Sequence, residues 1–201
     1  MTNMKPRRKN SLRLRGYDYS SVGAYFVTIV TWQREMLFGE IVDGEMVLNG
    51  VGGIAYKWWL KIPKHFPTVE LGNFVIMPNH VHGIIIITDG RGAVSAPVDG
   101  VEQVGRGGVA PPFDGIANNQ GRETLPLHRV QPKLGQIVGY FKYQSTKEMN
   151  AADGLGEITK FWQRNYHDRV IRNEREMARI WDYIESNPAR WDDDDENPRN
   201  W

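Results

Sequence analysis

The chain has 201 residues, of which 40% are hydrophobic, and this is enough to bury one core but not a second full domain. It contains no cysteine, which excludes a thiolate zinc site. No apolar run approaches the roughly 20 residues that span a bilayer, and the basic start lacks the apolar stretch of a signal peptide. We therefore expect a cytoplasmic protein with no membrane partner.

The net charge of +1 conceals two charged ends. Residues 1–15 form a basic arm without acidic residues, and residues 192–196 are all acidic. Such an arm often contacts phosphates, although a plain solvated tail has the same composition. We expect an arm at 1–15, one domain at 16–190 and an acidic tail at 191–201. The basic residues of the arm that we expect to bind DNA are Arg7, Arg8, Lys9, Arg13 and Arg15.

The first expected elements are strands. Residues 24–32 are rich in aromatic and β-branched side chains, which favours a central strand. Residues 40–42 and 45–48 flank Asp43-Gly44, a dipeptide typical of tight hairpins. A small hairpin should therefore follow the first strand.

A helix and two adjacent strands should come next. Apolar residues at three- and four-residue spacing predict a helix over 51–62, ended by Pro63. Residues 69–77 predict a strand, and Pro78-Asn79 predicts the turn into the next one. A helix followed by neighbouring strands indicates an α+β sandwich whose sheet is mainly antiparallel.

Two histidines stand at the start of that next strand, which spans residues 80–87. His80 and His82 point to one face because side chains alternate along a strand, while Val81 points to the other. Two imidazoles on one face could share a cation, or they could simply hydrogen-bond to the turn. Spacing alone leaves both interpretations open.

The second half of the chain begins with a break in the pattern. Residues 89–130 are rich in glycine and proline and predict a flexible loop within the domain. Residues 133–149 predict a helix with a basic flank. A last helix should begin at Asn173, an N-cap with Glu176 three places on, and end near Asn187 because Pro188 follows.

Tyr183 and Asn187 fall on one stripe of that last helix. A tyrosine in such a stripe is usually a core residue with a hydrogen-bonded hydroxyl. It could also be a nucleophile, with the Asn187 amide oxygen one turn later offered to the same metal as the histidines. Spacing cannot bring residues 82 and 183 together.

Three ordered segments resemble the REP-associated tyrosine transposases, single-tyrosine members of the HUH (His-hydrophobe-His) endonucleases related to the smallest insertion-sequence transposases. They are RRKNSLRLRGYDYSSVGAYFVTIVTWQREMLFGEI, HFPTVELGNFVIMPNHVHGIII and FWQRNYHDRVIRNEREMARIWDYIESNP. The resemblance spans roughly residues 7–90 and 131–190. It implies a ferredoxin-like sandwich with helices packed on a central antiparallel sheet.

The resemblance also implies site residues and a reaction. His80, His82 and Asn187 would bind a divalent metal, Mg or Mn, and Tyr183 would be the nucleophile. The reaction would nick and rejoin single-stranded or hairpin-forming DNA, such as palindromic repeats, through a 5′-phosphotyrosine intermediate. The protein would act as a monomer or homodimer.

Other residues and other functions remain open from the sequence. Tyr140, Tyr143 and Tyr166 are rival nucleophiles, although none occupies the motif position. The alternative functions are a non-catalytic nucleic-acid-binding module and a small-molecule metallohydrolase, and the basic arm argues against the latter. The basic residues of the last two helices that we expect to hold the DNA backbone, or to be merely solvated, are Lys142, Lys147, Arg172, Arg175 and Arg179.

Overall fold

The computed structural model describes residues 16–90, 131–153 and 159–200. Four strands form one antiparallel sheet in the order β4-β5-β1-β6, and β2 and β3 form a separate hairpin. The strands are β1 (Gly23–Val30), β2 (Gly39–Val42), β3 (Glu45–Leu48), β4 (Val69–Met77), β5 (His80–Ile87) and β6 (His167–Ile171). The helices are α1 (Gly50–Leu60), α2 (Ile62–His65), α3 (Leu134–Asp153) and α4 (Glu174–Ser186). This strand order with two crossing helices is the ferredoxin-like arrangement, so the predicted α+β sandwich is confirmed.

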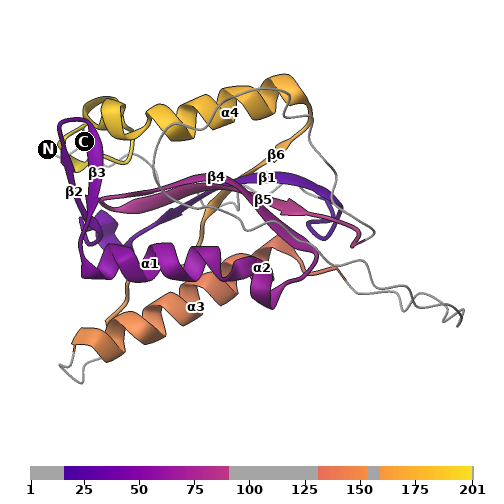
Figure 1. Ribbon diagram of the computed structural model, residues 1–201, viewed down its shortest axis with the longest axis horizontal. Coiled ribbons are helices and arrows are strands. Elements are labelled where there is room, and N and C mark those ends of the chain that lie inside the picture. Colours follow the sequence, from indigo (N-terminus) through magenta and orange to yellow (C-terminus); the bar gives the residue numbers. More distant parts are fainter. Residues whose placement is uncertain (1–15, 91–130, 154–158, 201) are drawn as a thin grey trace, which may run out of the picture.

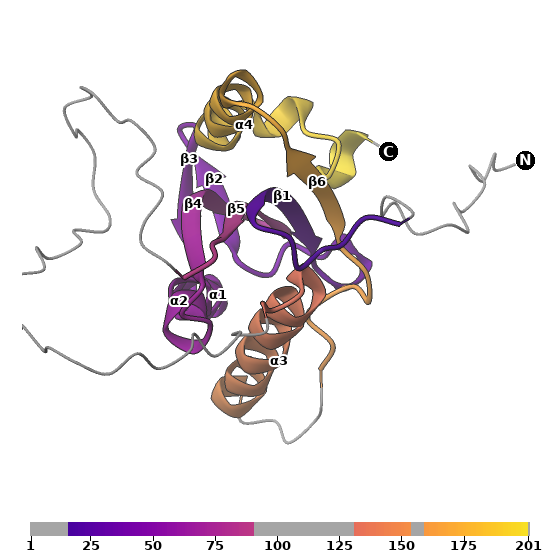
Figure 2. The same cartoon turned by 90° about the vertical axis from the view of Figure 1, so that its right-hand side faces the viewer.

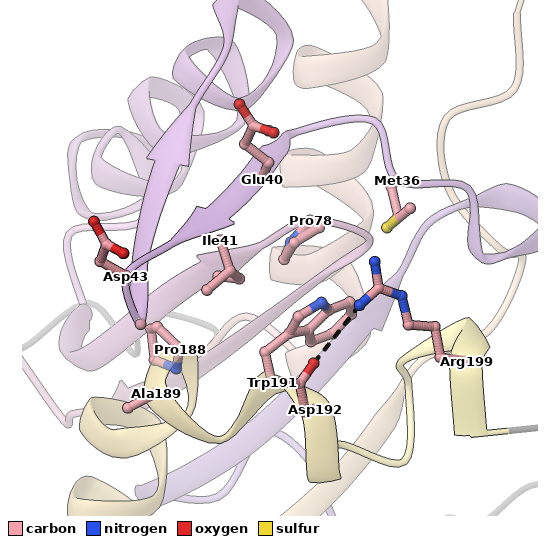
Figure 3. Close-up of a pocket in the computed structure, with 12 residues that line it drawn as sticks. Met36, Glu40, Ile41, Asp43, Pro78, Pro188, Ala189, Trp191, Asp192 and Arg199 are labelled. Carbon is pink, nitrogen blue, oxygen red and sulfur yellow. Dashed lines mark ion pairs between the residues drawn. The ribbon is translucent and has the colours of Figure 1, made fainter.

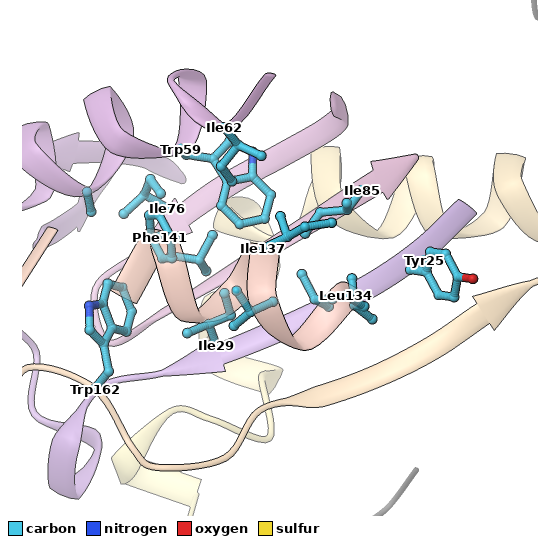
Figure 4. Packing of buried hydrophobic residues seen from close by; sticks show 14 of the residues in the cluster. Tyr25, Ile29, Trp59, Ile62, Ile76, Ile85, Leu134, Ile137, Phe141 and Trp162 are labelled. Carbon is cyan, nitrogen blue, oxygen red and sulfur yellow. The ribbon is translucent and has the colours of Figure 1, made fainter. Parts of the chain in front are cut away.

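Helices cover both faces of the sheet (Figure 1). In Figure 1 and in the view turned by 90° (Figure 2), α1, α2 and α3 lie on one side, and α4 lies on the other. The larger core lies between the sheet and α1 and α3, where Tyr25, Trp59, Ile85 and Phe141 are fully buried (Figure 4). The smaller core lies under α4. Its buried members are Ile84, Ile171, Ile180 and Ile184.

The two cores confirm that alternate side chains of the histidine strand, β5, point to opposite faces of the sheet. Val81 and Ile85 belong to the larger core, whereas Ile84 belongs to the smaller one. His80 and His82 alternate with Val81 on β5, so their side chains lie on the α4 side of the sheet. Because β5 pairs with β4 and β1 along its length, the histidines sit on a central strand.

Gly83 lets the sheet approach α1 closely. A Cβ atom at this position would lie 2.3 Å from Cζ2 of Trp59, far inside van der Waals contact. The Trp59 ring therefore packs directly on the backbone of β5. The glycine between the His-x-His pair and the isoleucine run is a packing residue.

The helix over 51–62 was predicted correctly except at its end. Pro63 does not terminate helical structure, because α1 ends at Leu60 and Pro63 lies in the first turn of the short helix α2. A proline is compatible with a first turn, where its missing N–H has no intrahelical partner to lose. The chain bends at Lys61 and continues as a second helix.

The last helix begins where the sequence predicts. The Asn173 side chain accepts a hydrogen bond from the Glu176 backbone N–H, as an N-cap does. The Glu176 carboxylate accepts from the backbone N–H of Arg172 and from Nε of Arg169. These bonds connect β6 to α4 and fix the direction in which α4 leaves the sheet.

The chain after α4, where we expected an acidic tail over residues 191–201, contains buried side chains. Trp191, Asp194 and Asn197 are buried, in the region of the two 3-10 turns Pro188–Asp193 and Pro198–Asn200. Asn197 donates to the Trp191 carbonyl and thereby ties the segment to itself. Within the described residues, no helix is long and apolar enough to cross a membrane.

Candidate active site

The two histidines lie against each other beneath the C-terminal segment, residues 188–200. Their ring centroids are 4.3 Å apart, and both side chains are almost completely buried. Val30 lies opposite His80 on β1, and Thr28 lies opposite His82. The regular pairing of β5 on both sides therefore holds the two imidazoles in register.

Asn79 fixes the orientation of His80. Nδ1 of His80 lies 2.8 Å from Oδ1 of Asn79, an oxygen that can only accept, so the His80 proton is on Nδ1. The Asn79 amide in turn donates to the carbonyls of Arg34 and Glu196. Nε2 of His80 is buried and has no hydrogen-bond partner among the described residues. A lone pair at Nε2 is therefore available to a cation.

His82 makes one contact at each ring nitrogen. Nδ1 lies 2.9 Å from Oγ1 of Thr28, and Nε2 lies 3.1 Å from the hydroxyl of Tyr183. A metal ion at Nε2 requires the tautomer with its proton on Nδ1, and Thr28 can accept that proton. The predicted contact between the His-x-His strand and the distant tyrosine helix is thus present.

Burial keeps both imidazoles neutral. Burial, with a smaller contribution from Arg34, lowers the pKa of His80 to about 3. Burial and the neighbouring His80 also hold the pKa of His82 well below its usual range, although Asp194 acts in the opposite direction. Neutral imidazole is the form that binds metal ions.

Tyr183 reaches the histidines from α4. Ile180 and Ile184 anchor the helix in the smaller core, and the Tyr183 side chain remains 41% exposed. Its ring packs edge-on against Phe26, with centroids 6.0 Å apart. Burial of the hydroxyl, followed by the charge of nearby Asp194, raises the pKa of Tyr183 to about 12. In this arrangement the phenol is protonated at neutral pH.

Asn187 ends α4 beside the same cluster. Its side chain is buried, Nδ2 donates to Oδ2 of Asp194 over 2.8 Å, and Oδ1 has no hydrogen-bond partner among the described residues. An unpartnered buried amide oxygen is a potential metal ligand. The structure therefore brings Asn187 to the group that also contains His80, His82 and Tyr183.

Asp194 is the member of the cluster that sequence reasoning missed. One ligand atom from each of His80, His82 and Asp194 lies within 4.8 Å of the others, so these three residues could hold a metal ion. The signals available in the sequence were weak: Trp191 interrupts a charged stretch, and Asn197-Pro198 repeats the Asn187-Pro188 pattern. Four consecutive aspartates instead indicated a solvated tail.

Comparison with known proteins identifies a relative that covers most of the chain. No protein-family model matches the sequence. An uncharacterised protein of Haemophilus influenzae strain Rd is 37% identical over 188 residues, which are 92% of this chain and 91% of that protein. This chain belongs to the same family.

Two solved structures are similar to this family member. One is a REP-associated tyrosine transposase bound to a REP hairpin, with 18% identity, a TM-score of 0.49, and coverage of 89% of this chain and 73% of that chain. The other is a candidate transposase from Deinococcus radiodurans, with 20% identity, a TM-score of 0.39, and coverage of 86% of this chain and 95% of that chain.

The predicted DNA-binding residues of this family member lie in three places. The arm residues Arg7, Arg8, Lys9, Arg13 and Arg15 lie outside the described residues. Those on and next to α4 (Arg172, Arg175 and Arg179) are exposed, as is Lys147 on α3. Lys142 is different, because it donates to the carbonyls of Gln163 and Asn165, and burial lowers its pKa to about 8.

The rival tyrosines lie elsewhere. Tyr140 stacks on His65 with ring centroids 4.0 Å apart, on the helix layer across the sheet from the histidines. Tyr143, also on α3, is 65% exposed, and Tyr166 lies beside Lys142. Within the described part of the chain, Tyr183 is the tyrosine whose hydroxyl reaches a histidine of the pair.

A cavity of about 600 Å³ adjoins the site. It lies between the β2-β3 hairpin and the C-terminal segment, with Glu40 and Asp43 on one side and Asp192 and Arg199 on the other (Figure 3). Trp191 lines the cavity, and its ring centroid is 6.1 Å from that of His80. The Trp191 side chain therefore contacts the cavity and lies close to His80.

Proposed function

We propose that this protein is a transposase-type DNA nuclease and strand transferase that acts on single-stranded or hairpin-forming DNA. The observation that carries the proposal is the position of the Tyr183 hydroxyl, 3.1 Å from Nε2 of His82, whose ring lies against that of His80. A nucleophile placed against a neutral imidazole pair matches the pattern of the His-hydrophobe-His endonucleases that the sequence resembles.

In the proposed reaction, Tyr183 attacks the phosphorus of one phosphodiester. A bond forms between the phenolic oxygen and phosphorus, and the bond from phosphorus to the 3′ oxygen breaks. The phenol loses a proton and the departing 3′ oxygen gains one, so charge and atoms balance. The 5′-phosphotyrosine link preserves the phosphodiester energy, and a second 3′-hydroxyl can reverse the step and join strands.

The side chains around Tyr183 fit a divalent metal. Two neutral imidazoles lie against each other there, and Asn187 is tied to the same cluster through Asp194. His80 Nε2 and Asn187 Oδ1 are buried without partners among the described residues. Such a mixture of nitrogen and oxygen donors can hold Mn, whereas Mg, which prefers oxygen ligands, would keep several waters at this site. When bound, such an ion supplies Lewis-acid polarisation of the scissile phosphate. His80 and His82 would bind the ion through Nε2, and Asn79 and Thr28 would fix the tautomers of the two imidazoles.

Basic residues near Tyr183 would hold the DNA backbone. Arg172, Arg175 and Arg179 project from α4 and its N-terminal junction into solvent, and each can pair with phosphate. The arm at 1–15 and Lys147 would add sequence-independent affinity. Binding of this kind should weaken as salt rises.

One observation favours the alternative function, a nucleic-acid-binding module without catalysis. A tyrosine is protonated at neutral pH even at its ordinary pKa, and burial and nearby carboxylates raise the pKa of Tyr183 to about 12, so the phenolate needed for attack is harder to form. A catalytic protein must overcome this when DNA and metal bind. A binding module need not.

The test is covalent capture. Wild type and Tyr183→Phe are incubated with a panel of labelled hairpin and single-stranded DNAs in Mg²⁺ or Mn²⁺, and adducts are resolved under denaturing conditions. We expect an adduct with wild type and none with Tyr183→Phe, while Tyr143→Phe, a control on α3, retains it. An adduct in Tyr183→Phe contradicts the assigned nucleophile. DNA binding without any adduct across the panel favours the binding module.

A further inference from the structure

We propose that Asp194 is a carboxylate ligand of the same metal ion, so that residues 188–200 form part of the metal centre. This rests on the metal site of the proposed function but not on its reaction. The added ligand comes from the segment that follows α4. The composition of that segment is typical of a solvated tail. The resulting donor set is two imidazoles, one amide oxygen and one carboxylate.

The first argument is the burial of charge. Asp194 is only 7% exposed, and among the described residues no lysine or arginine lies within ion-pair distance of its carboxylate. A buried carboxylate without a counter-charge is costly, and a divalent cation at this position removes the cost. The nearest potential cation site is the one formed with His80 and His82, whose ligand atoms lie within 4.8 Å of one another and of Asp194.

The second argument is that the Asp194 carboxylate is oriented as ligating carboxylates are. Oδ2 accepts from Nδ2 of Asn187 over 2.8 Å, and Oδ1 accepts from the Glu196 backbone N–H over 2.6 Å. Each oxygen keeps a further lone pair for a cation. The hydrogen bond from Asn187 Nδ2 to Asp194 also fixes the orientation of the Asn187 amide. With Nδ2 directed at Asp194, the amide oxygen Oδ1 must point away from this carboxylate. That Oδ1 is the buried oxygen without a partner.

The third argument is that one residue connects a histidine to the segment. Oδ1 of Asn79 holds His80, and Nδ2 of Asn79 donates to the Glu196 carbonyl over 2.7 Å. An ion pair between Arg34 and Glu196 adds a second connection. The segment is thus docked through the residue that orients a metal ligand. If Asp194 binds the ion, metal binding and docking of residues 188–200 must stabilise each other by the same free energy.

The test measures metal affinity without DNA. Binding of Mn²⁺ to the full chain is titrated by electron paramagnetic resonance of the free ion, for wild type, Asp194→Asn and Asp193→Asn. Asp193→Asn removes the same charge from the same segment as Asp194→Asn, but the Asp193 side chain lies in solvent. Loss of an outer-shell partner typically weakens affinity about 10–100-fold, so loss of a ligand should exceed about 100-fold. Asp193→Asn should stay within about twofold of wild type.

A second comparison separates ligation from an indirect effect through Asn187. Asp194→Asn is repeated in an Asn187→Ala background. If Asp194 is a ligand, Asp194→Asn should still lower the Mn²⁺ affinity in that background. If Asp194 only orients Asn187, the substitution should lower the affinity no further. Equal affinities of Asn187→Ala and the double variant overturn the ligand assignment.

Hydrogen exchange tests the docking of the segment and also shows whether each variant is folded. The amides of Asp194, Asn197 and Asn200 donate to carbonyls within residues 188–200. Saturating Mn²⁺ should slow their exchange in wild type and in Asp193→Asn but not in Asp194→Asn, while strand amides of β5 stay protected in all three. Exchange in this segment that Mn²⁺ leaves unchanged contradicts the proposal.

These outcomes are independent of DNA chemistry. A protein that forms no DNA adduct but loses Mn²⁺ affinity in Asp194→Asn supports the assignment and removes only the proposed function. A protein that forms the adduct while Asp194→Asn binds Mn²⁺ like wild type overturns the assignment alone. Wild type that binds no Mn²⁺ overturns it as well.

Discussion

The Tyr183 hydroxyl lies 3.1 Å from Nε2 of His82, although 101 positions separate the two residues in the chain. The fold brings the two residues together on one face of the sheet. The His82 imidazole projects from β5, and α4, which carries Tyr183, crosses above it. Phe26 on β1 packs against both rings, with centroids 5.3 Å from His82 and 6.0 Å from Tyr183. The contact therefore depends on the pairing of β1 with β5 as much as on either residue.

Gly83 should be the most size-sensitive position of the histidine strand. Gly83→Ala would place a methyl group 2.3 Å from the Trp59 ring, so we expect a loss of about 1–3 kcal/mol in the free energy of unfolding. The control is Gly139→Ala on α3, where the added Cβ meets no atom within 4 Å beyond its chain neighbours and the adjacent backbone of its own helix. That variant should gain up to about 1 kcal/mol from helix propensity. Urea unfolding of both variants measures the difference.

Asn79 should contribute to stability as well as to the site. Asn79→Ala removes the acceptor of the His80 Nδ1–H and the donor to two carbonyls, leaving buried groups without partners. We expect about 1–3 kcal/mol lower stability and weaker Mn²⁺ binding. Asn73→Ala, which loses one exposed hydrogen bond to the Trp181 carbonyl, should change stability by no more than about 0.5 kcal/mol. Equal effects of the two substitutions would contradict the role given to Asn79.

Glu176 should make stability fall in acid. The backbone N–H of Arg172 and then the Arg169 side chain lower the pKa of this carboxyl below its ordinary value of 4.5. A carboxyl with a depressed pKa stabilises the fold above the unfolded pKa, and the stabilisation is lost as pH falls through the folded value. We therefore expect Glu176→Gln to be less stable than wild type by on the order of 1 kcal/mol at pH 7. The gap should close below about pH 4.5.

Thermal unfolding between pH 3 and pH 7 measures that gap. The matched control is Glu174→Gln, because Glu174 is exposed in the same first turn of α4. Its unfolding should follow wild type across the range. A gap for Glu176→Gln that persists unchanged at pH 3 would falsify this role of the carboxylate.

Lys142 should act in the opposite pH range. Burial lowers its pKa from 10.5 to about 8, so the unfolded chain binds more protons than the fold between these values. Stability of wild type relative to Lys142→Met should therefore rise as pH increases from about 8 to 10.5. Lys147→Met, at an exposed position of α3, should show no such trend. Equilibrium unfolding at four pH values in this range distinguishes the two variants.

Sequence patterns predicted the framework well because its signals are local and periodic. Alternation placed His80 and His82 on one face, and an N-cap asparagine placed the start of the tyrosine helix. The end of the helix over 51–62 was wrong because Pro63 has two compatible positions, after a helix or in the first turn of the next one. Sequence alone does not distinguish these.

The candidate site was predicted in part. His80, His82, Tyr183 and Asn187 were expected to converge because of the family resemblance, since periodicity alone could not join them. Asp194 was missed because its burial depends on tertiary contacts with Asn187 and the Glu196 backbone, and nothing in a run of acidic residues distinguishes the one that turns inward.

The pairing of β5 on both edges gives the two halves of the site different mechanical properties. Opening the sheet at His80 and His82 would break two ladders of backbone hydrogen bonds, whereas α4 rests on the sheet through side chains and one amide contact from Asn73 to Trp181. Local unfolding should therefore release the helix at far lower free energy than the strand. In the reaction proposed above, a tyrosine joined to a DNA end would then be able to travel with that end, while the imidazoles would remain fixed for the reverse step.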